Sequence, residues 1–312
     1  MSSLPSSILH PPSSIFSLLK KWANFVKFSH TIFALPFALA AMVVAARDHG
    51  GWPGLRVAGL IVAAMVCART CAMAFNRIVD RKFDKANPRT ATRHLPAGQI
   101  SLTSAWSLWL LSAVGLMAAS YFINKLCFSL SPIALFIICF YSLTKRFTDF
   151  THFFLGIALA LAPVGAWLAV RGTSISLFEI GLAFVLALAV ICWLVGFDII
   201  YSIQDYEFDR RHGLHSLVVR WGPANALQFA FICHLLMWGL LALFGLLSRF
   251  RVAYFVGLLI ILVSLLLEHW LARRRSLNWI NHAFFRLNGL ISIVFLIVTI
   301  AEIVFPGFRI AR

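Results

Sequence analysis

Two short stretches of the chain place oxygen-bearing side chains four residues apart. Asn76, Asp80 and Asp84 form the first series, directly after an apolar run from Val57 to Phe75. On an α-helix, residues with this spacing project from nearly one face. Acidic groups at the mouth of a membrane helix are costly unless they bind a cation or a partner. Carboxylate and amide oxygens in this pattern suit Mg²⁺, which proteins often hold together with substrate phosphates.

The second stretch repeats the same period. Tyr201, Asp205 and Asp209 are again four residues apart, and Asp198 lies one residue off that series. More than half of the eleven acidic residues of the chain fall in these two stretches. A solvated loop between two helices would explain neither the spacing nor the concentration of acids. We therefore expect both stretches to face one shared site.

The composition defines the class of protein that carries these stretches. The chain has 312 residues, of which 61% are hydrophobic and only 12% are charged. This much apolar sequence indicates a polytopic membrane protein. The net charge of +16 does not indicate nucleic-acid binding, because the basic residues lie mainly in short loops between apolar runs. The six cysteines lie in apolar segments and form no CxxC pair, so we expect them to be packing residues.

Nine apolar runs have about the ~20 residues that a bilayer requires. They lie at about 29–46, 54–77, 102–122, 127–143, 151–170, 176–200, 224–247, 252–271 and 283–305. Residues 1–28 are expected to form a disordered tail followed by an interfacial amphipathic helix from Ile15 to Lys27. Residues 29–312 are expected to form a single transmembrane domain. The predicted fold is therefore an all-α, polytopic membrane bundle of about nine helices.

Loop charges predict how this bundle is oriented. The segment before the first span and the even-numbered loops carry seventeen Lys and Arg residues, whereas the odd-numbered loops carry six. The excess of basic residues marks the cytoplasmic side. Both acidic stretches then lie on that side, as a shared site requires.

Basic residues lie close to both acidic stretches in the sequence. Carboxylates alone would suit a divalent-cation or lipid-phosphate transporter, whose ionisable groups should continue along a path through the membrane. In this chain the ionisable groups are concentrated on one side of the membrane. Carboxylates mixed with many Arg and Lys residues suit a diphosphate bridged through a metal. With apolar helices beside them, these groups predict a lipid diphosphate as substrate.

Three segments of the sequence resemble motifs of the UbiA family of membrane prenyltransferases. The first runs from Asn76 to Asp84 and continues through Arg89 and Arg93. The second runs from Asp198 to Asp209, followed by a Gly-Leu-His-Ser sequence, and the third contains Lys145 and Arg146. The resemblance implies a nine-helix bundle around a central cavity. It also implies Mg²⁺-dependent transfer of a polyprenyl group from polyprenyl diphosphate to an aromatic ring.

Residue roles follow from this resemblance. The metal ligands would be Asn76, Asp80, Asp84, Asp198, Asp205 and Asp209, and the catalytic set would be Asp80, Asp84, Asp205 and Asp209. Residues for substrate binding would be Arg69, Lys82, Arg89, Arg93, Lys145, Arg146, Tyr201 and Arg211. Tyr201 would line the ring pocket or steady an allylic cation. Arg69, seven residues before Asn76 and inside a span, would bind the carboxylate of the acceptor or partner other polar groups.

The identity of the acceptor stays open between two aromatic acids. The resemblance to 4-hydroxybenzoate polyprenyltransferases implies 4-hydroxybenzoate and quinone biosynthesis. However, His215 stands where those enzymes often have a Lys. The amino-acid sequence of the second stretch more closely resembles a subgroup linked to menaquinone made through futalosine. The acceptor in that subgroup would be 1,4-dihydroxy-6-naphthoate. Haem or chlorophyll precursors are a third possibility. We expect the protein in a bacterial inner membrane, with its active site facing the cytoplasm.

Overall fold

The computed structural model describes residues 15–28, 31–274 and 277–305. This part of the chain is almost entirely helical and contains no strand. Eight of its helices are long and apolar enough to cross a membrane, and a ninth, α2, is apolar but shorter. The predicted all-α bundle with nine apolar helices is therefore confirmed.

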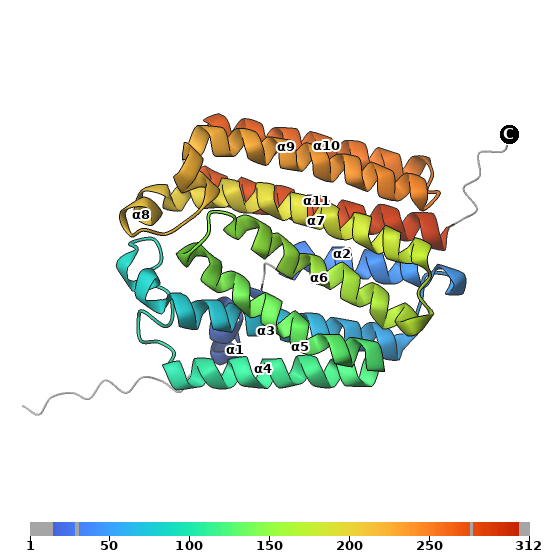
Figure 1. The fold of residues 1–312 in the computed structure, drawn as a ribbon, viewed down its shortest axis with the longest axis horizontal. Helices are drawn as coiled ribbons and strands as arrows, with labels where there is room; N and C mark the ends of the chain where they lie inside the picture. Colours follow the sequence, from blue (N-terminus) through green and yellow to red (C-terminus); the bar gives the residue numbers. More distant parts are fainter. Residues whose placement is uncertain (1–14, 29–30, 275–276, 306–312) are drawn as a thin grey trace, which may run out of the picture.

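The nine helices lie side by side along the long axis of the molecule, and the short helix α8 (Tyr206–Arg211) lies at one end (Figure 1). They are α2 (Thr31–Ala45), α3 (Leu55–Ala86), α4 (Leu102–Ile123), α5 (Lys125–Phe140), α6 (Thr151–Arg171), α7 (Leu177–Ser202), α9 (Leu217–Leu247), α10 (Val252–Arg274) and α11 (Leu277–Val304). Helix α3 continues nine residues beyond its predicted span, so the first acidic stretch is helical throughout.

The second acidic stretch is not one continuous helix. Helix α7 ends at Ser202, a 3₁₀ turn, η5, follows at Ile203–Asp205, and α8 then begins at Tyr206. The four-residue period of Tyr201, Asp205 and Asp209 therefore does not run along a single α-helix. A 3₁₀ turn has three residues per turn instead of 3.6 and redirects the chain.

Helix α9 has a break near its beginning. Gly222 has φ 79° and ψ 158°, outside the helical region, and Pro223 follows it. Glycine accepts this positive φ without steric cost, and proline has no backbone N–H to place in a helix. The predicted span therefore begins after the break, at residue 224, whereas the helix itself begins at Leu217 with Ser216 as its N-cap.

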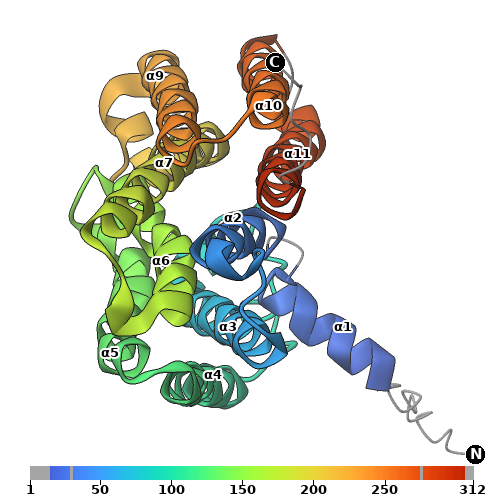
Figure 2. The same ribbon diagram turned by 90° about the vertical axis from the view of Figure 1, so that its right-hand side faces the viewer.

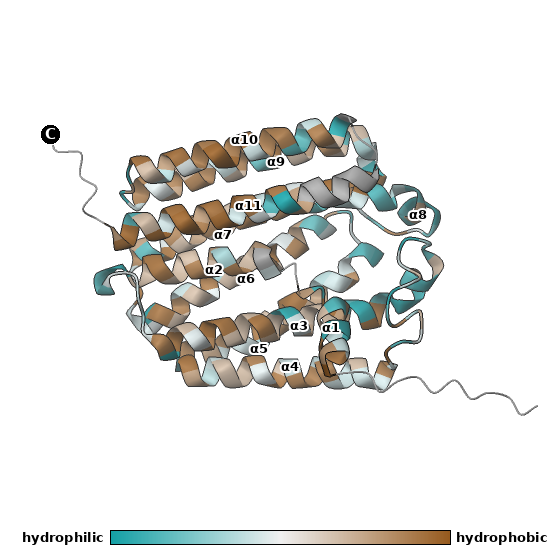
Figure 3. Cartoon of the chain, turned by 180° about the vertical axis from the view of Figure 1, so that it is seen from behind, coloured by the Kyte–Doolittle hydropathy of each residue, from teal (hydrophilic) through white to brown (hydrophobic). Residues whose placement is uncertain are grey.

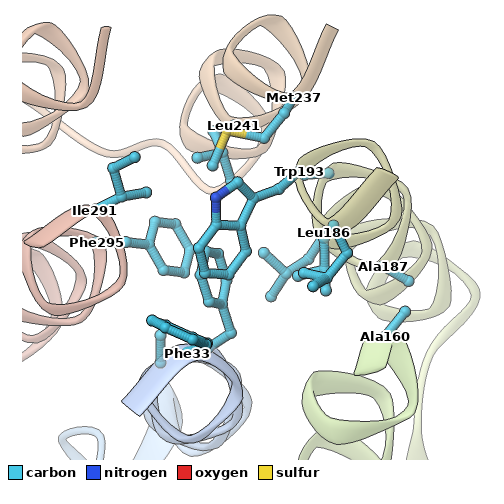
Figure 4. Close-up of a cluster of buried hydrophobic side chains, with 14 of the residues drawn as sticks. Phe33, Ala160, Leu186, Ala187, Trp193, Met237, Leu241, Ile291 and Phe295 are labelled. Carbon is cyan, nitrogen blue, oxygen red and sulfur yellow. The ribbon is translucent and has the colours of Figure 1, made fainter. Parts of the chain in front are cut away.

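Aromatic rings from several helices fill the core of the bundle. The buried Trp193 lies among side chains that include Phe33, Met237 and Phe295 (Figure 4). The Phe37 ring centre lies 5.0 Å from that of Trp193 and 4.7 Å from that of Phe295. Lipid is as apolar as these side chains, so close packing and interhelical hydrogen bonds hold such helices together.

Polar residues are concentrated at the ends of the bundle. Figure 3 shows hydrophobic residues along the helices and hydrophilic residues at the ends, most extensively around α8. Helix α1 (Ile15–Phe25) projects from the bundle (Figure 2). It exposes Ile15 and Phe16 and buries Phe25 in a cluster with Met73 and Ile78. Residues 1–14, on which we expect a disordered tail, lie outside the described residues.

Candidate functional site

A polar cavity of about 270 Å³ opens at the α8 end of the bundle. Both acidic stretches and the η3 turn (Tyr141–Arg146) line it. It brings together twelve of the predicted site residues: Arg69, Asn76, Asp80, Asp84, Arg89, Arg93, Lys145, Arg146, Asp198, Tyr201, Asp205 and Asp209. Residues more than a hundred positions apart in the sequence therefore meet at one place.

The acids of the first stretch are held by basic residues from elsewhere in the chain. Arg146 donates to Asp80 Oδ1 at 2.9 Å, and Asn76 Nδ2 donates to Asp80 Oδ2 at 2.9 Å. Arg93 donates to Asp84 Oδ1 at 2.6 Å. Asn76 and Asp80 thus act as neighbours one helical turn apart, as their spacing predicts.

The acids of the second stretch are paired in the same way. Arg89 donates to Asp205 through both Nε, at 2.8 Å from Oδ1, and Nη2, and the two bonds form a bidentate pair. Its Nη1 also donates to the Tyr201 hydroxyl at 3.1 Å. Lys145 Nζ donates to Asp209 Oδ2 at 3.2 Å. Partial burial lowers the pKa of Arg89, but its bonds to Asp205 and Tyr201 outweigh this and raise the pKa above its usual value.

Two predicted substrate-binding residues, Lys82 and Arg211, do not line the cavity. Lys82 is exposed on α3, two residues beyond Asp80. Two residues correspond to a turn of ~200° on a helix, so its side chain points away from the acids. Arg211, two residues beyond Asp209, is likewise exposed, and its guanidinium lies 4.0 Å from Glu207.

The donor atoms are of the type that a divalent metal requires, although they do not form a ready-made metal site. The described residues contain no group of three or more His, Cys, Asp or Glu side chains placed to hold an ion. The four paired carboxylates nevertheless surround one cavity, with the Asn76 amide beside them. Asp84 Oδ2 is buried and accepts no hydrogen bond within the described part of the chain; Arg77 lies 4.0 Å away. Hard cations such as Mg²⁺ prefer these oxygens, so the residues fit the metal.

Arg69 lies at the junction of two cavities. A second cavity of about 280 Å³ runs between α3, α4, α5 and α6 and is lined mainly by apolar side chains. Arg69, Tyr141 and Leu159 line both cavities. The buried Arg69 Nε has no hydrogen-bond partner among the described residues.

Two residues of the site, Asn87 and His152, were missed from the sequence, and Arg77 was recognised only as one of the basic residues close to the first acidic stretch. Arg77 and Asn87 line the polar cavity, and Asn87 Nδ2 donates to Asp205 Oδ1 at 3.1 Å. His152 is fully buried at the beginning of α6, and its Nδ1 lies 2.7 Å from Asp198 Oδ2. Asn87 is near enough to Asp84 in the sequence to have been suggested. His152 gave no signal, because 46 residues separate it from Asp198.

His215, where the sequence departs from the usual pattern, holds two loops together. Its backbone N–H donates to the Lys145 carbonyl at 2.7 Å, and its Nδ1 lies 3.0 Å from Asp149 Oδ1. Arg220 donates to the other oxygen of Asp149 at 2.9 Å. Desolvation raises the pKa of Asp149, but the hydrogen bonds from Arg220 and His215 lower it by more. The pKa of Asp149 is therefore below its usual value. The departure therefore lies beside Lys145, on the rim of the site.

Known proteins are similar to this chain in sequence and in fold. The model of the UbiA prenyltransferase family matches residues 34–290. A 4-hydroxybenzoate octaprenyltransferase of Francisella tularensis is 28% identical over 269 residues, 85% of this chain and 89% of that protein. The apo structure of a UbiA homologue from Aeropyrum pernix K1 is 32% identical, with TM-score 0.79, over 88% of this chain and 98% of that one.

A more distant structure shares the fold. The UbiA homologue from Archaeoglobus fulgidus, solved bound to DMAPP and Mg²⁺, has TM-score 0.67 and 21% identity over 91% of this chain and 99% of that one. The family match extends over most of the chain and confirms both the resemblance and the predicted enzyme class. It assigns a transferase and not a transporter. The chain belongs to the UbiA prenyltransferase family and is an integral-membrane prenyltransferase.

Proposed function

We propose that this enzyme transfers a polyprenyl group from polyprenyl diphosphate to a small aromatic acid, with 4-hydroxybenzoate as the leading acceptor. The bond between prenyl C1 and the diphosphate oxygen breaks, and its electron pair leaves with the diphosphate. A ring carbon of the acceptor forms the new bond to C1, and the proton on that carbon then leaves to restore the aromatic ring.

The paired charges of the polar cavity support diphosphate binding together with a metal. Asp80, Asp84, Asp205 and Asp209, with Asn76, would hold Mg²⁺, which stabilises the charge on the departing diphosphate. Arg89, Arg93, Lys145 and Arg146 would then turn from these carboxylates to the diphosphate oxygens. Because each acid and each base finds a new partner, no buried charge is left unpaired. The DMAPP and Mg²⁺ bound by the Archaeoglobus homologue support this assignment.

Arg69 is the observation that supports an acidic acceptor. The Nε of Arg69 is buried, and this side chain forms no salt bridge within the described ranges. A cation without an anionic partner is costly inside a membrane, and a ligand carboxylate would supply one. The residue lies seven positions before Asn76, about two turns or ~10 Å deeper along α3. An acceptor bound there lies below the diphosphate, next to the walls that would receive the hydrocarbon chain.

Asp198 offers a second contact for the acceptor. Its side chain lines the polar cavity together with Arg69. Both 4-hydroxybenzoate and 1,4-dihydroxy-6-naphthoate carry a carboxylate and a hydroxyl. We therefore assign the carboxylate of the acceptor to Arg69 and its hydroxyl to Asp198. In this proposal Asp198 is no longer one of the metal ligands that the resemblance implies.

The sequence around His215 favours the naphthoate as a second candidate acceptor. Curated relatives carry the name 4-hydroxybenzoate octaprenyltransferase. The amino-acid sequence of the second acidic stretch, in contrast, more closely resembles the menaquinone subgroup. The location we propose is the bacterial inner membrane, with the cavity on the cytoplasmic side, because basic residues are concentrated in the loops of that side.

Prenylation by the purified protein tests the proposal directly. The enzyme in detergent receives labelled geranyl or longer prenyl diphosphate, Mg²⁺, and one of the two acids at a time. We expect product from one acid, lost on adding EDTA and in Asp80→Ala and Asp205→Ala. Lys82→Ala is the matched control, because this residue is exposed outside the cavity. Binding of the prenyl diphosphate with no product from either acid would refute both acceptors but leave the family assignment intact.

A further inference from the structure

A buried histidine stands behind Asp198. His152, in the first turn of α6, has 0% of its side chain exposed, and its Nδ1 lies 2.7 Å from Asp198 Oδ2. Asp198 has 20% of its side chain exposed and lines the polar cavity, whereas His152 does not line it. The carboxylate therefore lies between the imidazole and the space where substrates bind.

Close packing of α6 against α7 brings the two residues together. Gly156 lies one turn after His152, and a Cβ at that position would lie 3.1 Å from both Cα and O of Ile191 on α7. This distance is tighter than most Cβ contacts, so a residue without a side chain lets the two backbones approach closely. The close approach of α6 and α7 lies one turn from His152, where the imidazole reaches Asp198 of α7.

The partner of Asp198 differs in kind from those of the other acids in the cavity. Asp80, Asp84, Asp205 and Asp209 each pair with an Arg or Lys side chain. Asp198 has no Arg or Lys salt bridge within the described ranges, and its hydrogen bond there is to the imidazole. When diphosphate and metal enter, the cationic partners can turn to the diphosphate. The imidazole is buried outside the cavity and cannot.

This contrast leads to one inference, which rests on the proposed function. We infer that His152 is a positioning residue that fixes Asp198 toward the hydroxyl of the aromatic acceptor and keeps it out of the metal-binding set. An Nδ1–H bond to Oδ2 sets the rotamer of the carboxylate. A buried hydrogen bond to a charged group is strong enough to select one rotamer over others.

Variants of His152 separate this role from simple packing. His152→Asn retains an N–H donor near the position of Nδ1, whereas His152→Leu fills similar space with no donor. We expect His152→Leu to raise the KM for the acceptor about tenfold, the effect of losing one charge-assisted bond. The KM for prenyl diphosphate should change less than about twofold, and His152→Asn should recover most of the acceptor KM. An acceptor KM unchanged in His152→Leu would overturn the inference.

Metal binding gives a readout that does not depend on turnover. Mn²⁺ affinity is measured by electron paramagnetic resonance with a non-hydrolysable prenyl thiolodiphosphate present, for wild type, His152→Leu, Asp198→Asn and Asp205→Asn. We expect weaker Mn²⁺ binding only in Asp205→Asn. Weakening in Asp198→Asn equal to that in Asp205→Asn would return Asp198 to the metal set and overturn the inference.

Two further comparisons keep the outcomes distinct. If His152→Leu does not fold, as judged by gel filtration and thermal unfolding in detergent, His152→Ala takes its place, with His152→Asn as its donor-retaining match. If wild type prenylates neither acid, the proposed acceptors are wrong, and the Mn²⁺ measurement alone decides whether Asp198 is held apart from the metal.

Discussion

Replacing Arg69 with methionine should make the protein more stable and less active. The side chain is partly buried in α3, and its buried Nε has no hydrogen-bond partner among the described residues. Placing an Arg at the centre of a membrane helix costs about 2.5–3.5 kcal/mol on insertion scales. The side chain is only partly buried and lines the polar cavity, which offsets part of this cost. We therefore expect Arg69→Met to raise the free energy of unfolding by about 1–2 kcal/mol.

The loss of activity in Arg69→Met should fall on the acceptor alone. Losing a buried charge pair with a carboxylate costs about 2–5 kcal/mol, or a fall of roughly 30-fold or more in kcat/KM for the acceptor. The KM for prenyl diphosphate should stay close to that of wild type, because the polar cavity keeps its other basic residues. Arg69→Lys keeps the charge but loses the planar guanidinium with its two parallel donors. Its kcat/KM for the acceptor should therefore lie between those of wild type and Arg69→Met.

Thermal unfolding in detergent and steady-state kinetics with each substrate varied in turn measure these effects. A methionine variant that unfolds at lower temperature would show that Arg69 is a structural partner for polar groups between helices. An acceptor kcat/KM unchanged from wild type would refute the carboxylate assignment. Either result would also remove the main support for an acidic acceptor.

Three further predictions follow from the packing and charges of the site. Gly196→Ala should lower the free energy of unfolding by about 1–3 kcal/mol in a thermal scan, because the new Cβ would overlap the His234 ring; Gly239→Ala, with open space around it, is the control. Lys82→Ala and Arg211→Ala should each keep kcat/KM for prenyl diphosphate within about threefold of wild type, and a larger loss in either would place it in the site. Adding EDTA should abolish prenyl transfer and weaken diphosphate binding, with recovery on adding Mg²⁺; activity that survives chelation would exclude the metal.

The sequence predicts the helices well because the bilayer imposes a strict length and composition. Each of the nine apolar runs corresponds to a helix of the structure, and α3 carries the first acidic stretch as a continuous helix. The break between Ser202 and Tyr206 could not be predicted, because no glycine or proline marks it. The kink at Gly222 and Pro223, by contrast, is readable from the residues themselves.

Pairings across the site could not be obtained from the sequence. Spacing along one helix predicts that Asn76 and Asp80 are neighbours, but not that Arg146 reaches Asp80 or that Arg89 reaches Asp205. Those contacts depend on how separate helices and loops pack. Proximity in the sequence also misleads, since Lys82 adjoins the acidic positions and yet points away from them.

The described charge pairs explain why metal and diphosphate should bind together. A diphosphate arriving alone could take Arg89 from Asp205 or Lys145 from Asp209, leaving a mostly buried carboxylate unpaired. A metal arriving alone would leave the cations facing one another. Either intermediate carries a desolvated charge without a partner, which is costly at low dielectric. When both enter, every carboxylate and every cation would regain an opposite charge, so we expect each ligand to raise the affinity for the other by the same factor.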